Sequence, residues 1–235
     1  MIPRTPLQLV TSVPPEHTGW TPRRDDVSEE GFGGFRDTWL IRGVGIREAK
    51  ALIQVERELI DLADRYASDS VEFDAICSAL EACDAGTLPA RLREPSVPAD
   101  IAVHVHGDED YSPSEGLDLG VGGLVYSLAT VGFWTAASCR GHSGKYAWSD
   151  HPIVAFACDR HRVAAFQPWV ESAGCGLTTD EHREGLLAVV AESVEDTMAL
   201  ARMVADHRSE FIPHRVTRPR SGGQTMQGVF DLGDY

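Results

Sequence analysis

The order of apolar segments between residues 100 and 209 constrains the fold more than any other feature of the sequence. Six segments show either the period-two pattern typical of strands or the three-and-four spacing typical of helices. In chain order they are a strand at 101–106, a helix at about 115–131, strands at 133–138 and 153–158, a helix to about residue 172 and a strand at 185–192. Another helix follows Ser193. This order predicts an α+β fold: a ferredoxin-like βαββαβ two-layer sandwich plus an extra C-terminal helix.

Changes of composition along the chain predict four parts. These are an irregular, proline-containing N-terminal arm at 1–45, an acidic helical hairpin with a proline-rich linker at 46–98, the α/β domain at 99–209, and a flexible basic tail at 210–235.

The hairpin is predicted from two adjacent helical patterns. The first covers about 46–66, and Asp69 is a plausible N-cap for the second, which we expect to end at Gly86. Nine acids and two arginines lie between Glu56 and Asp84, so the outer faces are strongly negative. The apolar face that contains Leu52 is suited to packing within the hairpin and equally to packing on a second subunit, so a homodimer is one expectation.

The overall charge and the cysteines narrow the class of protein. The chain has 235 residues and a formal charge of −15, which disfavours broad binding to nucleic-acid backbones. It has no apolar run long enough to span a membrane and no signal-peptide pattern at its N-terminus. Five irregularly spaced cysteines indicate free thiols, so we expect a cytoplasmic protein.

In a ferredoxin-like sandwich, three of the predicted connections meet at one end of the sheet. Residues of the types that commonly bind ligands or take part in catalysis are concentrated in these connections. They are His106, Asp108, Asp110, Cys139, Arg140, His142, His151, Asp180 and His182. Loops that converge on a rigid scaffold commonly form ligand sites. We therefore expect a functional site at this end.

The segment Ser138–His142 provides the candidate catalytic residues. Cys139 follows a strand, and His142 comes three residues later, so the pair is suited to metal binding or to an activated thiolate. Arg140 would favour the thiolate or contact an anion. The alternative is a tight structural hairpin in which Cys139 is a small buried residue.

A second group of residues is suited to metal binding. Strand alternation would place His104 and His106 on one face, where Asp108 and His151 could complete a site for a divalent metal such as zinc. The alternative is a strand that ends in a solvated acidic turn.

Glycines in the helix predicted after residue 115 suggest close approach of its backbone to a ligand or to a packed element. The candidate cofactor-binding residues are Gly120, Gly122, Gly123, Ser138 and Trp148. An anion at the helix N-terminus would suit them, although close helix-to-sheet packing explains the glycines equally well.

The stretch Gly132–His142, followed by Pro152–Phe156, resembles the helix, strand and Ser-Cys-x-Gly turn of the tRNA wybutosine-synthesis methyltransferase family. It also resembles uncharacterised bacterial and phage proteins with a G-x-x-T-x-x-S-C-x-G-H pattern. The similarity covers about residues 115–205. The first resemblance would imply S-adenosylmethionine and a tRNA purine base. Because residue 142 is histidine where that family tends to have arginine, only the position of the site, around Ser138 to His142, carries over.

Two functions follow from these observations. The first is a cytoplasmic enzyme with a Cys/His site at the loop end of its sheet, acting on a small, nucleotide-like substrate with the help of a metal. The second is a non-catalytic binding or regulatory module that engages a protein partner through its acidic helical hairpin.

Overall fold

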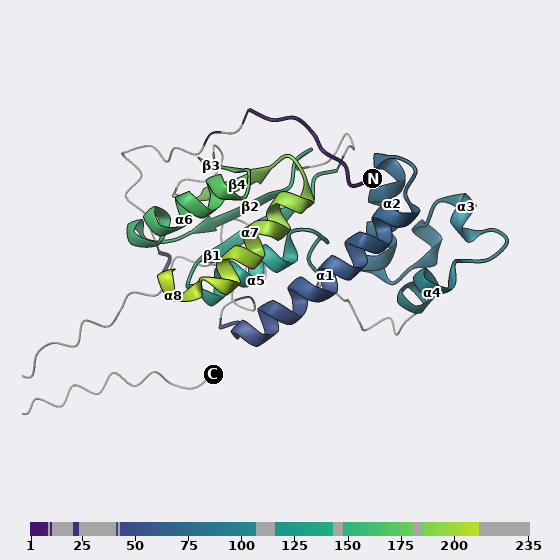
Figure 1. Ribbon diagram of the computed structural model, residues 1–235, viewed down its shortest axis with the longest axis horizontal. Helices are drawn as coiled ribbons and strands as arrows, with labels where there is room; N and C mark the ends of the chain where they lie inside the picture. The colour runs from purple at the N-terminus through teal and green to yellow at the C-terminus, as the bar shows by residue number, and fades with distance from the viewer. Residues whose placement is uncertain are drawn as a thin grey trace, which may run out of the picture.

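The computed structural model describes residues 1–8, 10, 21–23, 41, 43–106, 116–142, 148–180 and 185–211. In these residues helices pack on one face of a four-stranded sheet, so the fold is α+β (Figure 1). The strands are β1 (Trp134–Cys139), β2 (Ile153–Ala157), β3 (Cys175–Thr179) and β4 (Leu187–Ala191). They lie in the order β1-β2-β4-β3, and each neighbouring pair is antiparallel.

The helices fall into two groups along the chain. The first group consists of α1 (Ile46–Tyr66), α2 (Ser70–Ala82), the 3-10 turn η2 (Ala85–Thr87), α3 (Ala90–Arg93) and α4 (Ala99–Val105). The second consists of α5 (Gly122–Thr130), α6 (Arg160–Ser172), α7 (Val194–Asp206) and α8 (Arg208–Phe211). None of the helices in the described part of the chain is both long enough and apolar enough to cross a membrane.

The predicted first strand is wrong. Residues 101–105 belong to α4, where Ile101 and Val105 are buried and Val103 is 71% exposed. Ile101 and Val105 are four residues apart and therefore share one face of a helix. A strand would have placed Ile101, Val103 and Val105 on the same face. Without this strand the described residues do not show the βαββαβ order. The described elements instead run α5-β1-β2-α6-β3-β4-α7.

The sheet contains a strand that the sequence reading took for a connection. β3 forms a hairpin with β4, in which Thr179 pairs with Leu187. Leu187 pairs in turn with Phe156, whereas Cys139 pairs with Ile153 at the other end of the sheet. Asp180, directly after β3, therefore lies at the end opposite Cys139, and its predicted place in the same site is wrong. Asp110 and His182 lie outside the described residues.

One face of the sheet supplies most of the core. Val154 and Phe156 of β2 pack with Leu177 of β3 and Val189 of β4 against buried side chains of α5, α6 and α7. Ala155 and Ala157, the alternate residues of β2, belong to a smaller cluster. This alternation is the period-two pattern that predicted the strand. The N-caps Asp159 and Ser193, predicted for the helices now labelled α6 and α7, accept backbone hydrogen bonds there, and α6 continues through Pro168.

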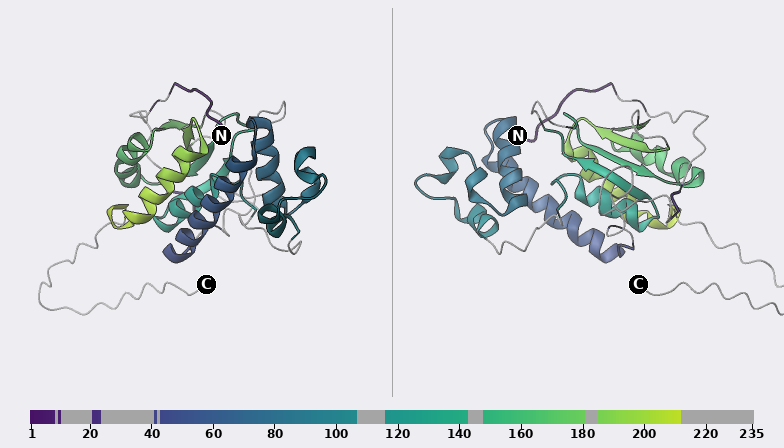
Figure 2. Two further views of the ribbon diagram at one scale, coloured as in Figure 1. Left: turned by 45° about the vertical axis from the view of Figure 1, so that its right-hand side comes forward. Right: turned by 180° about the vertical axis from the view of Figure 1, so that it is seen from behind.

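Helix α1 contacts both the helices that cover the sheet and the other helices of the first group (Figure 2). Its N-terminal half packs on α5 and α7 through Leu52 and Ile53, so this apolar face is buried within the chain. Its C-terminal half, with Leu59 and Ile60, packs with α2 and α4 in a second core cluster. Helices α1 and α2 thus contact each other, with Asp69 as the N-cap of α2 as predicted. Helix α2 ends at Ala82, with Cys83 as its C-cap in the left-handed conformation, and not at Gly86.

Part of the N-terminal arm lies on the folded body. The Thr5 amide donates to the Glu192 carbonyl at 2.8 Å, and Arg4 pairs with the carboxylates of Glu192 and Asp196. Further along, the Leu177 amide donates to the Val10 carbonyl at 2.7 Å, which adds a backbone contact to β3 at the edge of the sheet. The tail predicted at 210–235 lies almost wholly outside the described residues.

Candidate functional site

The candidate site begins at the end of β1, where the chain turns sharply. Gly141 has φ +88°, and a Cβ atom there would lie 2.8 Å from the backbone carbonyl carbon of His151. Only glycine meets both conditions without strain. The turn directs the next residue back, so that the His142 amide donates to the Ser149 carbonyl at 3.0 Å. Cys139, Arg140 and His142 are thereby held in fixed positions.

The Arg140 side chain points away from the sheet and toward helix α2. Its side chain is 2% exposed, and Nη2 donates to Asp74 Oδ1 at 2.8 Å and to Ser78 Oγ at 3.3 Å. Nη1 pairs with the carboxylate of Glu81. Most of the guanidinium's donors are therefore used within the protein, which argues against the predicted role of Arg140 as an anion contact. Its observed role is to join the end of β1 to α2.

His142 lies between two carboxylates from different parts of the chain. Its Nδ1 atom is 2.8 Å from Asp74 Oδ1, and its Nε2 atom is 3.3 Å from Asp118 Oδ2. Asp118 Oδ2 also accepts from the Arg140 amide at 3.0 Å, which fixes it beside the turn. The His142 side chain is 30% exposed, and those of both aspartates are 31% exposed, so solvent or a small ligand reaches this group.

Cys139 completes a group of three potential metal ligands. One ligand atom each from Asp118, Cys139 and His142 lies within 4.8 Å of the other two, a set that has no equivalent elsewhere in the described residues. The Cys139 side chain is buried, and its sulfur accepts from the Gly141 amide at 3.4 Å. Thiolate, imidazole and carboxylate are the three ligand types that proteins use for zinc.

The protonation of His142 depends strongly on the neighbouring carboxylates of Asp74 and Asp118. Hydrogen bonds with Asp118, Asp74 and Cys139 raise the pKa of His142 to about 12. Burial is the largest single influence on Asp74 and Asp118 and opposes their ionisation, yet the hydrogen bonds and positive charges of His142 and Arg140 together outweigh it, and the pKa of each carboxyl is lowered. An imidazolium between two carboxylates acts on Cys139 as a nearby positive charge and not as a general base.

The other predicted metal ligands do not join this group. His104 is half-buried on α4 and His106 is exposed at its end, and neither contributes to the three-ligand group. Asp108 lies outside the described residues. His151 is near the loop, but its Nε2 atom is 3.5 Å from Asp150 Oδ1 and its ring is not among the three ligands.

The glycine-bearing segment at the start of α5 binds a carboxylate of the protein itself. Glu56 of α1 is 1% exposed, and its Oε1 atom accepts from the Gly120 amide at 2.8 Å and from the Gly123 amide at 3.2 Å. A Cβ atom on Gly123 would lie 2.6 Å from Glu56 Oε2. Glu56 thus occupies the helix N-terminus at which an anionic ligand was expected, and Gly120, Gly122 and Gly123 serve packing. Ser138 lies within β1, and Trp148 is 39% exposed in the loop.

Glu56 makes the stability of the fold depend on pH. Burial raises its pKa to about 7, against the opposing hydrogen bonds from Gly123 and Gly120. Between the unfolded pKa near 4.5 and pH 7 the folded state therefore holds a proton that the unfolded state has lost, so stability falls as the pH rises. We expect the free energy of unfolding to fall by an amount on the order of 3 kcal/mol across this window relative to a Glu56→Gln variant.

Urea unfolding of both proteins at a series of pH values measures this difference. Glu192→Gln is a suitable control for the loss of a carboxylate, because the pKa of Glu192 is lowered and not raised. A parallel pH dependence of the wild type and Glu56→Gln would contradict the expectation.

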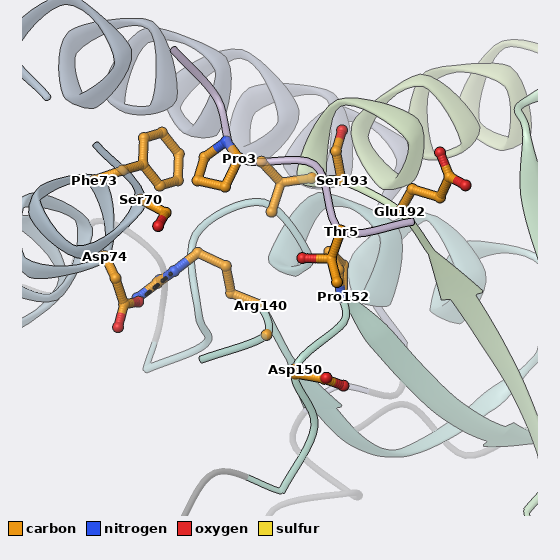
Figure 3. A pocket seen from close by; sticks show the side chains of 12 residues that line it. Pro3, Thr5, Ser70, Phe73, Asp74, Arg140, Asp150, Pro152, Glu192 and Ser193 are labelled. Carbon is orange, nitrogen blue, oxygen red and sulfur yellow. Dashed lines mark hydrogen bonds and ion pairs between the residues drawn. The ribbon is translucent and has the colours of Figure 1, made fainter. Parts of the chain in front are cut away.

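A pocket of about 110 Å³ adjoins the three-ligand group (Figure 3). It lies between the N-terminal arm, the start of α2, the β1–β2 loop and the start of α7, and its lining consists of Pro3, Thr5, Ser70, Phe73, Asp74, Arg140, Gly141, Asp150, Pro152, Glu192, Ser193 and Val194. Figure 3 shows the Arg140 guanidinium turned toward Asp74. Asp74 and Gly141 contact His142 and Cys139 directly, so the pocket shares a wall with the group.

Sequence reasoning missed Asp74, Asp118, Glu56 and Glu81. Two of these residues, Asp74 and Glu81, lie in a pattern that could have been noticed. Asp74, Ser78 and Glu81 are four and three residues apart, so they form a polar stripe on one face of α2, and all three contact Arg140. Asp118, by contrast, was taken as an ordinary residue of a helix that in fact begins only at Gly122.

Comparison with protein-family models, with curated proteins and with solved structures finds no match for this chain. The resemblance to the wybutosine-synthesis methyltransferases therefore continues to rest on the short motif around Ser138–His142 alone.

Proposed function

We propose that this protein is a metal-dependent enzyme in which Asp118, Cys139 and His142 hold a divalent transition metal, most suitably zinc. The observation that supports this most strongly is the convergence of three different ligand types, from two separate segments, within 4.8 Å. The cysteine thiolate favours zinc over the hard cations magnesium and calcium, which prefer all-oxygen sites.

The separation of the ligand atoms suits a tetrahedral metal. Zinc–nitrogen and zinc–oxygen bonds are about 2.0–2.1 Å long, so two such ligands on a tetrahedron lie roughly 3.3 Å apart. His142 Nε2 and Asp118 Oδ2 are 3.3 Å apart. A metal between them would replace the proton that the imidazole donates to the carboxylate in the metal-free protein.

Three protein ligands suit a catalytic metal better than a structural one. A zinc ion with three protein ligands keeps a fourth position for water or substrate and lowers the pKa of that water to about 7. The partial exposure of His142 and Asp118 leaves such a position accessible. We therefore expect water-dependent chemistry on a small substrate.

The adjacent pocket limits the size and charge of that substrate. At about 110 Å³ it is much smaller than the roughly 300–1,000 Å³ of typical sites for drug-sized ligands. Its one cation, Arg140, is paired with Asp74 and Glu81, and Glu192 is paired with Arg4, whereas Asp150 adds negative charge. A small neutral or cationic group suits this pocket better than a nucleotide phosphate does.

Metal content tests the proposal. Protein purified without chelator or affinity tag is expected to contain about one equivalent of zinc by elemental mass spectrometry, because structural and catalytic sites with this ligand set bind zinc tightly. Cys139→Ala and Asp118→Asn should each lose it. His161→Ala is the matched control, since His161 is exposed on α6 and outside the ligand group.

Each outcome has a clear meaning. Metal in the wild type and control that is lost in both ligand variants supports the proposed centre. If the wild type contains no metal and takes up none from added zinc, iron or manganese, the proposal fails. The non-catalytic reading then becomes the working hypothesis, and a search for protein partners follows.

A further inference from the structure

Asp74 reaches the candidate centre from outside the sheet layer. It lies on α2, 68 residues before His142, yet its Oδ1 atom is 2.8 Å from His142 Nδ1. The same oxygen accepts from Arg140 Nη2 at 2.8 Å, so the guanidinium fixes the position of the carboxylate. The Arg140 side chain is 2% exposed and that of Asp74 is 31% exposed, so the guanidinium side of this pairing is buried.

The contact determines which imidazole nitrogen is available to a metal. A neutral histidine has one N–H donor and one lone pair. When Nδ1–H donates to Asp74, the lone pair is on Nε2, and Nε2 is the atom that faces Asp118 Oδ2 at 3.3 Å. The aspartate thus selects the tautomer and the ring orientation that a metal between His142 and Asp118 requires.

We infer that Asp74 is the positioning residue of the centre, holding His142 in the Nδ1–H tautomer by a carboxylate–histidine–metal relay. This inference rests on the proposed function. Outer carboxylates of this kind fix the ligand ring and raise its basicity, and their loss typically weakens metal binding about 10–100-fold. Helix α2 of the acidic hairpin consequently forms part of the metal centre.

A simpler role for Asp74 is to anchor Arg140, and one control variant separates the two. Ser78 lies on the next turn of α2 and accepts from Arg140 Nη2 at 3.3 Å, but no contact joins it to His142. Ser78→Ala therefore disturbs the Arg140 anchor without touching the imidazole. A role confined to anchoring predicts similar behaviour of Ser78→Ala and Asp74→Asn.

Cobalt(II) titration of metal-stripped protein, followed by visible absorption, is the test. Asp74→Asn is expected to weaken cobalt binding about 10–100-fold and to change the absorption of the bound ion, because the ring is less well oriented and less basic. Asp74→Glu should recover part of the affinity, since it restores the carboxylate at a partly exposed position. Ser78→Ala should match the wild type in affinity and spectrum.

The outcomes distinguish the two proposals. If the wild type binds no cobalt, the metal centre itself is overturned. If the wild type binds cobalt and Asp74→Asn binds it with the same affinity and spectrum, the centre stands and the role of Asp74 is overturned. A second measurement needs no variant: ring ¹⁵N spectra of the metal-bound wild type should show a protonated Nδ1 and a metal-bonded Nε2, and the opposite tautomer would contradict the inference.

Discussion

Replacement of Arg140 by methionine is expected to destabilise the protein by about 3–5 kcal/mol, the range for removing one partner of a buried ion pair. Methionine has a similar length but no charge, so the carboxylates of Glu81 and Asp74 would lose their shared cation inside the protein. The pKa of Glu81 is already raised, first by burial, so an unpaired Glu81 carboxylate is especially costly. Urea unfolding followed by far-ultraviolet circular dichroism measures the change.

A double variant tests the physical reason for this loss. Arg140→Met combined with Glu81→Gln removes the cation and one of its anions together, and it should be more stable than the sum of the two single effects predicts. A cost below about 1 kcal/mol for Arg140→Met would show that the pairing behaves like an exposed salt bridge.

Gly120→Ala is expected to cost about 4 kcal/mol, because two separate penalties apply at the same residue. Gly120 has φ +95°, a conformation that residues with a Cβ atom rarely adopt, and a Cβ atom there would lie 2.5 Å from the Cβ atom of Val194. Val194 is the first residue of α7 and is itself buried, so neither side can move freely. Thermal and urea unfolding of the variant measure the loss.

Two further variants separate the backbone strain from the steric clash with Val194. Gly43→Ala places a methyl group at φ +81° with no atom within 4 Å, and it should show the backbone strain alone. Gly120→Ala combined with Val194→Ala should recover the part that arises from the clash. If Gly43→Ala and Gly120→Ala are equally destabilised, close packing against α7 contributes nothing and the account given for Gly120 is wrong.

The sequence predicted those elements whose patterns were long or capped. Helix α1 extends over the expected residues, and Asp69, Asp159 and Ser193 cap their helices as predicted. The short apolar segment at 101–105 was ambiguous, because Ile101, Val103 and Val105 satisfy both a strand and one turn of helix. Tertiary packing of Ile101 and Val105 in the helical cluster decided the outcome.

The missed strand has a similar cause. Cys175–Thr179 contains one large apolar residue, Leu177, between small and polar neighbours, so no strand pattern is visible over its length. It forms because β4 supplies a complete ladder of partners beside it. Such long-range pairing leaves little trace in the local sequence.

The candidate site was predicted in part. The turn at Cys139, Arg140 and His142 was identified because cysteine, glycine and histidine occur within four residues of a strand end. The partners Asp74 and Asp118 lie 68 and 24 residues away, and their approach depends on how α2 and the segment before α5 pack. The interior ion pairs of Arg140 were equally invisible, because exposed and buried arginines look alike in a sequence.

The backbone hydrogen bond between the Leu177 amide and the Val10 carbonyl is relevant to aggregation of the protein. Strand β3 ends the sheet, and an uncovered edge strand invites pairing with a strand of another molecule. The amide of Leu177, in the middle of β3, is already bonded to the N-terminal arm of its own chain. Val10 therefore occupies one donor of this edge, and we expect removal of the arm to favour edge-to-edge aggregation and to open the pocket that Pro3 and Thr5 line.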